Sequence, residues 1–400
     1  MNAPSLRSLA LAFFIAASSP SALISAQRLV LIAPDHKARL PEVLELNLEE
    51  VLRHIPDLDH KSVENAETHQ RLTTQMYASP GSTSSDKLLI AIQVPASGRL
   101  VLDFVEKQRG DSPSPLVFGR EAPERKDDFA WENQEVAYRV YGPALEATGE
   151  ITSGIDVWSK RAPAFVIDSF YKHDAEGART HNPALSYHKD DGVGLDSYQV
   201  GPTRGCGGTA IVSGDKLYVS KNYTHLKVLS NGPVRFEFEM TYAPWNADGT
   251  QVTETKRITL DAGSHLNRIQ STFTFSGQQT VQAAAGLALH PGADLHTFQN
   301  DSILSVWDTP QDPSAGRIAT GLLTPSGQAH HTATIDGQAM IIFPVRSGQS
   351  FTYYAGSGWS KSDMPTQQAW DAYLNATLSQ VRHPLKVTWA AIPEEKKSHP

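Results

Sequence analysis

Apolar and polar residues alternate along several segments of this chain, as expected for strands that bury one face. The clearest case is Val234–Tyr242 (VRFEFEMTY), where Val, Phe, Phe, Met and Tyr share one face and Arg, Glu, Glu and Thr share the other. An Asp-Gly pair at Asp248 and Gly249 separates this segment from Val252–Leu260, which has the pattern of a hairpin partner. These segments predict neighbouring strands of an antiparallel sheet.

Similar patterns recur elsewhere in the chain and predict a mainly β protein. Further strands are expected at Val43–Leu48, Leu88–Val94, Arg99–Val105, Leu266–Phe275 and Val281–Leu289. Helical spacing of apolar residues is clear after Thr366, a suitable helix cap, with members at Trp370, Tyr373, Leu374, Leu378 and Val381. We therefore expect a mainly β fold of antiparallel sheet with few helices.

The distribution of turn formers divides the chain into parts. The segment Arg109–Pro115 (RGDSPSP) has the Gly, Ser and Pro content of a linker. It predicts a small β-rich domain over residues 27–110 and a larger domain of antiparallel sheet over residues 116–390. Residues 391–400 are rich in charge and predict a solvated tail.

The first 26 residues have the features of an export signal. Arg7 precedes the apolar run Leu9–Ala17, which is too short to span a bilayer, and Ser25 and Ala26 offer a cleavage site. We expect a secreted or periplasmic protein, with an uncleaved anchor as the alternative. Cys206 is the only cysteine, so no disulfide within the chain is available.

Composition excludes several classes of protein. The 400 residues include 28 Gly, 25 Pro, 7 Trp, 12 Tyr and 14 Phe, which fits a turn-rich fold of short strands and excludes collagen and coiled coils. The net charge of −8, from 43 acidic and 35 basic residues without a basic block, argues against nucleic acid as a partner. No membrane association is expected beyond the export signal.

The densest group of reactive side chains lies in the glycine-rich segment Tyr187–Gly208 (YHKDDGVGLDSYQVGPTRGCGG). Turn formation explains its Asp and Gly residues but not its His, Tyr and Arg residues. Cleavage of a uronic acid polymer by β-elimination needs a base, a cation for the carboxylate and an acid for the leaving oxygen. We expect His188 or Tyr187 as the base, Tyr198 as the acid and Arg204 as the carboxylate clamp. The alternative is a surface connection without a catalytic role.

The same segment also allows a metal site. Asp190, Asp191 and Asp196 provide the oxygen ligands that Ca²⁺ prefers, although the spacing is not that of an EF-hand. Calcium is therefore a candidate ligand, and no other cofactor is required by the sequence. Phosphate-binding loops, dinucleotide fingerprints, HExxH and GxSxG motifs are all absent from the sequence.

Other polar and aromatic residues are candidates for substrate binding. These candidates are Trp158, Lys160 and Arg161 in DVWSKR, His290 at a strand end, and Trp245 and Trp359 at turns. Tryptophans at turns suit stacking on sugar rings, and the alternative is that each fills the core. His290 is a catalytic candidate if it faces a groove, and otherwise a histidine hydrogen-bonded at the end of its strand.

Two further functions remain open at this point. A glycoside hydrolase needs two carboxylates on either side of one bond, for which Asp191 or Asp196 with Glu237 or Glu239 are available. A non-catalytic carbohydrate-binding protein would instead present a line of exposed tryptophans.

Several strings of the chain resemble a family of exported bacterial proteins catalogued as a domain of unknown function. The strings are DDFAWENQEVAYRVYGPALE, SGIDVWSKR, YHKDDGVGLDSYQVGPTRGCGG, KVLSNGPVRFEFEMTYAPW, ETKRITLDAGSHLNR and YYAGSGWSKS. The family often occurs beside polysaccharide-degrading enzymes. The resemblance therefore implies a carbohydrate context.

The paired strands and the His-Pro-Gly strand end also look similar to the galactose-mutarotase type of β-supersandwich. Aldose epimerases, several polysaccharide lyases and domains of some glycosidases share that scaffold. The resemblance implies a site on a concave sheet face, with Arg235, Glu237, His290 and Arg257 near the Tyr187–Gly208 segment. Together with the residue types above, it favours a lyase that acts on an acidic polysaccharide or oligosaccharide.

Overall fold

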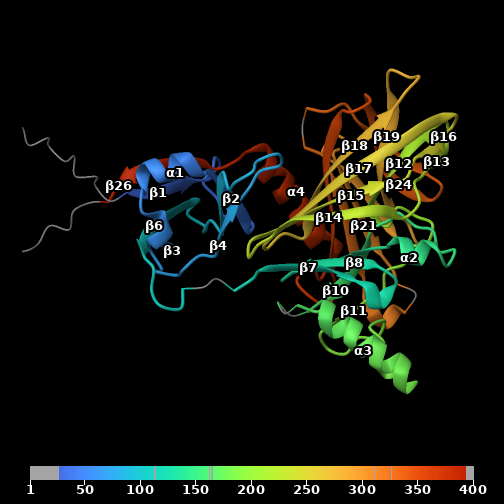
Figure 1. Cartoon of the computed structure of the whole chain (residues 1–400), viewed down its shortest axis with the longest axis horizontal. Helices are drawn as coiled ribbons and strands as arrows, with labels where there is room; N and C mark the ends of the chain where they lie inside the picture. The colour runs from blue at the N-terminus through green and yellow to red at the C-terminus, as the bar shows by residue number, and fades with distance from the viewer. Residues whose placement is uncertain are drawn as a thin grey trace, which may run out of the picture.

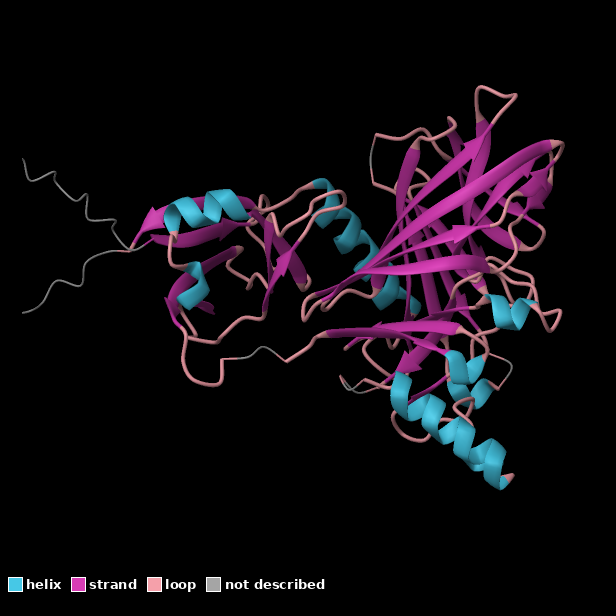
Figure 2. Ribbon diagram, viewed as in Figure 1, coloured by secondary structure: helices cyan, strands magenta, loops and turns pink. Residues whose placement is uncertain are grey.

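The computed structural model describes residues 27–392, apart from 112, 113, 162, 164, 311 and 326. The export signal predicted at residues 1–26 and nearly all of the predicted charged tail lie outside the described residues. As predicted, the described chain is mainly β, with antiparallel sheets and few helices (Figure 2). None of the described helices is long and apolar enough to cross a membrane.

The N-terminal unit has its own small core and lies at the left of Figure 1. In the described residues its sheets have the orders β26 (Lys386–Ala391), β1 (Gln27–Ile32), β6 (Arg99–Glu106), β3 (Lys61–Asn65) and β2 (Glu42–Asn47), β5 (Lys87–Ile92), β4 (Thr74–Tyr77). Helix α1 (Leu48–His54) begins where the Asn47 side chain accepts a hydrogen bond from Glu50 N. Because β26 pairs with β1, a strand from the C-terminal part of the chain completes a sheet of the N-terminal unit.

The larger body is built on one extended antiparallel sheet, which we call the large sheet. Among the described residues its order is β14 (Tyr223–Asn231), β15 (Arg235–Tyr242), β17 (Thr250–Asp261), β18 (Leu266–Phe275), β25 (Ser350–Trp359), β22 (Ile318–Leu323), β21 (Ile303–Asp308), β20 (Asp294–Phe298), with β16 (Trp245–Ala247) paired to β17. The predicted alternation in β15 is confirmed, because Phe236, Phe238 and Met240 are fully buried.

Two smaller sheets cover the inner face of the large sheet and complete a β-sandwich. The β8 sheet, as described, is β11 (Gly194–Leu195), β10 (Asp156–Lys160), β9 (Ala137–Val140), β8 (Asp128–Asn133), β7 (Val117–Ala122), and the β12 sheet is β13 (Lys216–Tyr218), β12 (Cys206–Ser213), β19 (Val281–Ala288), β24 (Gln338–Val345), β23 (His331–Ile335). Phe129 packs on Phe238 at 4.7 Å between ring centroids. A parallel bridge between Ile155 and Gly205 links the two smaller sheets.

Helices cover the outer faces of the sandwich. The predicted helix is α4 (Gln367–Arg382), capped as expected by Thr366, whose hydroxyl accepts from Ala369 N; it packs on β21 and β22. Helix α3 (Ile167–Thr180), which the sequence pattern did not reveal, covers the outer face of the β8 sheet, where Phe170 packs on Trp158. Helix α2 (Pro143–Glu146) is a single turn after β9. Helix α3 therefore covers part of the outer face of the β8 sheet.

Candidate active site

A cluster of charged residues surrounds Arg139 on the outer face of the β8 sheet. Strand alternation explains the arrangement, because Tyr138 and Val140 face the core and Arg139 faces outward. Asp156 on β10 is the direct cross-strand partner of Arg139. Asp128, at the start of β8, lies with its Oδ2 3.7 Å from Arg139 Nη1.

The Arg139 guanidinium holds the cluster together. It donates to Asp156 Oδ2 from Nε at 2.9 Å and to Asp196 Oδ2 from Nη2 at 2.9 Å. Nη1 donates to the Tyr187 hydroxyl at 3.0 Å, and Nη2 lies 3.4 Å from the Tyr141 hydroxyl. Two carboxylates and two phenols are thus positioned by one side chain, which is 6% exposed.

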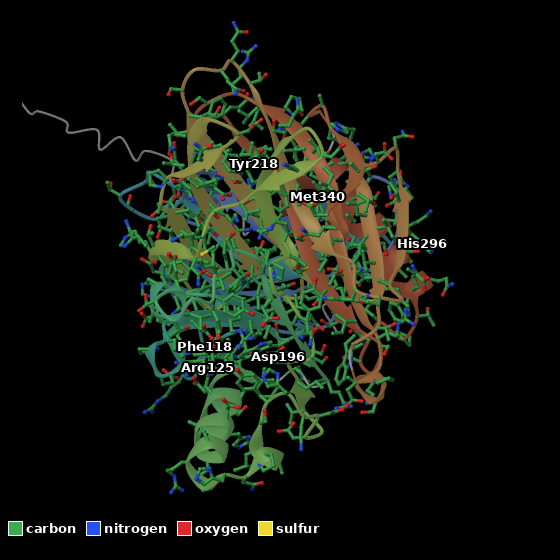
Figure 3. All side chains as sticks on the ribbon, turned by 90° about the vertical axis from the view of Figure 1, so that its right-hand side faces the viewer. Phe118, Arg125, Asp196, Tyr218, His296 and Met340 are labelled. Atoms are coloured by element: carbon green, nitrogen blue, oxygen red, sulfur yellow. The ribbon has the colours of Figure 1, made fainter. Side chains whose placement is uncertain are left out.

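The glycine-rich segment contributes Tyr187 and Asp196 to this cluster. Tyr187 stacks on Trp158 at 5.4 Å, and its hydroxyl also accepts from Arg125 Nε at 3.1 Å. Asp196 accepts a hydrogen bond from Arg139 Nη2 and is 2% exposed. Figure 3 labels Arg125 and Asp196, which lie at the same end of the molecule, above α3.

A cavity of about 360 Å³ opens beside the cluster. Its lining residues are Arg125, Lys126, Asp128, Arg139, Tyr141, Leu145, Glu150, Ile151, Thr152 and Gly201. The rim carries backbone in an uncommon conformation, since Lys126 and Asp127 both have positive φ, at 57° and 59°. The cavity thus joins three cationic side chains to two carboxyl groups and a phenol.

Burial shifts the protonation of the three aspartates. It raises the pKa of Asp128 to about 7, against the lowering effect of Arg139 and Arg125. Burial also raises the pKa of Asp196, with the nearby Asp156 charge adding to it, and burial raises the pKa of Asp156. All three carboxyl groups therefore lose their protons less readily than a free aspartate.

Asp128 differs from the other two aspartates in its contacts. Its Oδ1 is buried and has no hydrogen-bond partner among the described residues. It is also the one of the three aspartates that lines the cavity. An unpaired buried carboxyl oxygen is uncommon and marks Asp128 as a candidate functional residue.

The structure separates the predicted catalytic residues. His188 lies at the surface, with 56% of its side chain exposed and Nδ1 2.9 Å from the Asp196 carbonyl oxygen. Arg204 is 1% exposed and donates to Ser153 Oγ at 2.8 Å and to the carbonyl oxygens of Thr209 and Pro202. The carboxylate-clamp role of Arg204 is therefore corrected: its guanidinium is buried among protein groups and cannot reach a glycan.

Tyr198 and His290 belong to a second cavity of about 240 Å³. Their rings meet edge to face at 5.5 Å. His290 Nδ1 is hydrogen-bonded to Asp308, which raises the pKa of His290, and Nε2 lies 2.7 Å from the Gln199 carbonyl oxygen. Tyr198 and Tyr187 therefore do not converge on one cavity, because Tyr187 binds Arg139 whereas Tyr198 lines the second cavity.

The predicted sugar-stacking tryptophans are largely core residues. Trp158 is fully buried beneath Tyr187, and Trp359 is 2% exposed with Nε1 donating to the Ala315 carbonyl oxygen. Trp245 is half-buried and meets Phe273 edge to face at 6.1 Å. These three indoles contribute to packing. Of the two alternatives that the sequence offered, filling the core fits them better than stacking on a sugar ring.

Lys160 and Arg161, which follow Trp158 along β10, have protein partners. Lys160 is buried, and its Nζ lies 2.7 Å from Glu132 Oε2. Arg161 forms an ion pair with Asp190 and lies over the Trp359 ring at 4.5 Å. Neither side chain faces the cavity beside Arg139.

Arg235 and Glu237 lie on the other outer face of the sandwich. Arg235 binds Asp261 and, through Nη1 at 2.6 Å, Glu45 of the N-terminal unit. Glu237 accepts a hydrogen bond from the Tyr77 hydroxyl at 2.7 Å. The proposed hydrolase pairing of Asp196 with Glu237 is corrected, because the two carboxylates occupy opposite outer faces.

The three aspartates considered for calcium also have separate partners. Asp190 pairs with Arg161, Asp196 binds Arg139, and Asp191 Oδ1 accepts from Val193 N. They do not form a common ligand set in the structure.

The residues that the sequence did not single out are Arg125, Asp128, Arg139 and Tyr141. All four lie in or next to Asp127–Glu146, a string that carried the family resemblance. The alternation in DFAWEN and AYRV places Asp128 and Arg139 on the face opposite Phe129 and Tyr138. That alternation was the available indication of a charged outer face.

Comparison with known proteins identifies relatives over most of the chain. A family model described as a domain of unknown function (DUF4861) matches residues 33–387. The chain is similar to Uncharacterized protein P7 of Formosa agariphila, with 28% identity over 364 residues that cover 87% of this chain and 89% of the relative.

Two solved structures from Enterococcus faecalis are also similar over most of this chain. One is an alpha-mannosidase (9% identity, TM-score 0.46) and the other a protein in glycosyl hydrolase family 38 (8% identity, TM-score 0.47). They cover 92% and 94% of this chain, and the chain spans 46% and 48% of theirs.

Proposed function

Because the chain belongs to the DUF4861 family, a domain of unknown function, we propose an activity from its own residues: β-elimination on a uronic-acid-containing glycan in the cavity beside Arg139. The observation that carries the proposal is the Asp128 carboxyl. Its Oδ1 is buried and unpaired among the described residues, its pKa is raised to about 7, and it shares the cavity wall with cationic side chains. A base with this pKa is suited to proton abstraction near neutral pH.

The cationic groups suit an acidic sugar. Arg125 and Lys126 line the cavity with Arg139, and a guanidinium binds a carboxylate in a two-pronged geometry. Neutralising the uronate carboxylate makes the neighbouring C5 proton more acidic. A volume of about 360 Å³ lies at the small end of ligand sites and suits the end of a sugar chain or a short oligosaccharide.

The proposed reaction uses two side chains for proton transfer. Asp128 takes the C5 proton, the electron pair forms the C4–C5 double bond, and the C4–O4 bond breaks. The leaving O4 takes a proton from the Tyr141 hydroxyl. Arg139 Nη2, 3.4 Å from that hydroxyl, stabilises the phenolate that forms, and solvent then returns Asp128 and Tyr141 to their starting states.

Asp156, Asp196 and Tyr187 act as positioning residues in this proposal. Each binds Arg139 and fixes the direction of its guanidinium. None of the three lines the cavity. Their removal is expected to misplace Arg139 without removing the proton acceptor.

Hydrolysis is the second candidate, and one observation favours it. Glu150 lines the same cavity, and its charge contributes to the raised pKa of Asp128. A protonated Asp128 with an ionised Glu150 provides the acid and base of a glycoside hydrolase. The two reactions need opposite protonation states of Asp128, so the pH dependence distinguishes them.

A non-catalytic binding role has less support. Of the described tryptophans, none is exposed, so a line of stacking surfaces is missing from the part of the chain that the structure describes. We also propose, from the features of residues 1–26, that the protein is exported to the periplasm or the medium. Fractionation of cells that express the full chain tests this.

The direct test is an assay on a panel of uronic acid polymers and oligomers. Elimination produces an ultraviolet-absorbing double bond conjugated to the carboxylate, whereas hydrolysis produces reducing ends without that absorbance. The proposal expects a rise in absorbance from the wild type and a rise at least roughly 10²-fold slower from Asp128→Asn. Asp191→Asn, an exposed aspartate outside the cavity, is the matched control. Reducing ends without absorbance would transfer the assignment to hydrolysis, and neither product on any acidic glycan would reject both.

A further inference from the structure

Three side chains outside the proposed active site converge near the other end of β8. Glu135 comes from the turn between β8 and β9, His265 from the turn between β17 and β18, and Asp363 from the segment after β25. One ligand atom from each lies within 4.8 Å of the others. In the described chain this is the group of three or more His, Cys, Asp or Glu residues close enough to share a metal ion.

The imidazole of His265 is oriented as in metal-binding histidines. Its Nδ1 lies 2.9 Å from the Ser357 carbonyl oxygen, which can only accept, so Nδ1 carries a hydrogen. The other ring nitrogen, Nε2, then faces the carboxylates and lies 2.7 Å from Asp363 Oδ2. A backbone carbonyl that fixes the tautomer in this way is a recurrent partner of metal-ligating histidines.

The backbone that carries these side chains is well held. Asn133 Nδ2 donates to the carbonyl oxygens of Asp261 and Ser264 at 2.8 and 2.7 Å, and Asn133 Oδ1 accepts from Glu135 N at 2.9 Å. His265 N donates to the Tyr373 hydroxyl at 2.8 Å. The turns that present Glu135 and His265 are therefore joined directly before any ion binds, which lowers the cost of assembling a site.

We infer that Glu135, His265 and Asp363 form a binding site for a divalent transition-metal ion of the Zn²⁺ or Mn²⁺ type. One imidazole nitrogen and two carboxylate oxygens make a mixed ligand set, whereas Ca²⁺ and Mg²⁺ favour sites made of oxygen alone. His265 is 3% exposed, while the Asp363 side chain is 44% exposed. Water completes the coordination on the Asp363 side.

Binding replaces the hydrogen bond between His265 and Asp363 by two metal–ligand bonds of about 2.0–2.2 Å. The ion then joins the β8 sheet to two segments of the large sheet through three ligands. Its effect is on stability and is separate from the proposed elimination, since none of the three ligands lines the cavity of Asp128. The competing explanation is a simple ion pair between a protonated His265 and Asp363.

Metal titration of the full-length protein distinguishes these explanations. The protein is stripped with EDTA, dialysed, and titrated with Zn²⁺, Mn²⁺, Ca²⁺ or Mg²⁺ while bound metal and the thermal unfolding midpoint are measured. The site predicts one equivalent of bound Zn²⁺ or Mn²⁺ and a rise in the midpoint that saturates with it. Ca²⁺ and Mg²⁺ at the same concentration are expected to have little effect.

Variants localise the binding. Asp363→Asn lies at the solvent-exposed rim and leaves the buried histidine in place, so it is expected to fold; it should weaken Zn²⁺ or Mn²⁺ binding by roughly 10- to 100-fold or more. Glu135→Gln should do the same. Glu176→Gln on α3, whose side chain is 45% exposed, removes an unrelated carboxylate as the control. Binding that is absent in the wild type, or equal in Asp363→Asn and the control, would overturn the inference.

Discussion

Two buried charge networks share the outer face of the β8 sheet, and they differ in completeness. Lys160 Nζ donates to Glu132 Oε2 at 2.7 Å and to the Asn133 carbonyl oxygen at 2.6 Å. Glu132 in turn accepts from the backbone N of Val166 and Ile167, where α3 begins. Every partner of this pair is a protein group, and the helix closes over it.

The network around Arg139, in contrast, is not fully hydrogen-bonded within the described part of the chain and borders a cavity. It contains an excess of carboxyl groups, an unpaired Asp128 oxygen among the described residues, and a cavity at its side. A buried ion pair with all partners satisfied anchors a helix, whereas an incomplete one at a cavity is prepared to bind or react. The Lys160–Glu132 pair therefore has the contacts of a structural ion pair, whereas the Arg139 network has those expected of the proposed site.

The largest expected effect is loss of activity on removing the Asp128 carboxyl. Asp128→Asn keeps the shape of the side chain and removes the proton acceptor, so turnover should fall by roughly 10²- to 10⁴-fold. Initial rates on the responsive glycan, with circular dichroism as a check of folding, measure it. Retained turnover would remove Asp128 from the mechanism.

Removing the charge of Lys160 should lower the stability of the protein and leave its turnover unchanged. Lys160→Met leaves Glu132 without its cation, and the free energy of unfolding should fall by about 3–5 kcal/mol. Urea denaturation measures this loss, and adding Glu132→Gln to the variant should recover part of it. Turnover per folded molecule should stay at the wild-type value, and a selective loss of turnover would contradict the separation between the two networks.

A smaller effect is expected from Arg125. Its guanidinium lines the cavity and is proposed to bind the substrate carboxylate. Arg125→Gln should weaken substrate binding by about 1.5–3 kcal/mol, which is measured as a rise in KM. Lys172→Gln, an exposed lysine on α3, is the control. Equal KM values for the two variants would argue against carboxylate recognition by Arg125.

The last prediction concerns the pH dependence of stability. Because burial raises the folded-state pKa of Asp128 to about 7 from an ordinary value of 3.8, its protonated form favours folding, and that contribution is lost as pH rises toward and through 7. Asp128→Asn has no such loss. Its thermal midpoint relative to the wild type should be higher at pH 8 than at pH 4, and a constant difference would show that the Asp128 pKa is ordinary.

The sequence was most informative where neighbours along the chain decide the structure. Alternation in Val234–Tyr242 predicted β15, and Thr366 predicted the start of α4, because both depend on local geometry. The pairing of β26 with β1 depends on residues more than 350 positions apart, as in Leu29 opposite Trp389, and no local pattern contains it. Local patterns therefore predicted the elements better than their partners.

The candidate site was predicted in part. The glycine-rich segment does bring Tyr187 and Asp196 to a charged cluster, but Arg204 turns into the core and Tyr198 into a second cavity. Proximity in sequence could not show these directions, because loop residues follow no fixed alternation. The central cation, Arg139, lies on β9, outside the glycine-rich segment. It occupies an ordinary polar position of an alternating strand, so its sequence context did not distinguish it.

The pH dependence of kcat/KM on a uronic acid polymer tests the central claim most directly. If Asp128 is the base of an elimination, kcat/KM measured by ultraviolet absorbance should rise with pH, with a midpoint near its pKa of about 7, and then level off. Asp128→Asn should abolish the rising limb together with the activity. A limb that falls through the same pH range, with reducing ends as the product, would contradict elimination and identify Asp128 as the acid of a hydrolase.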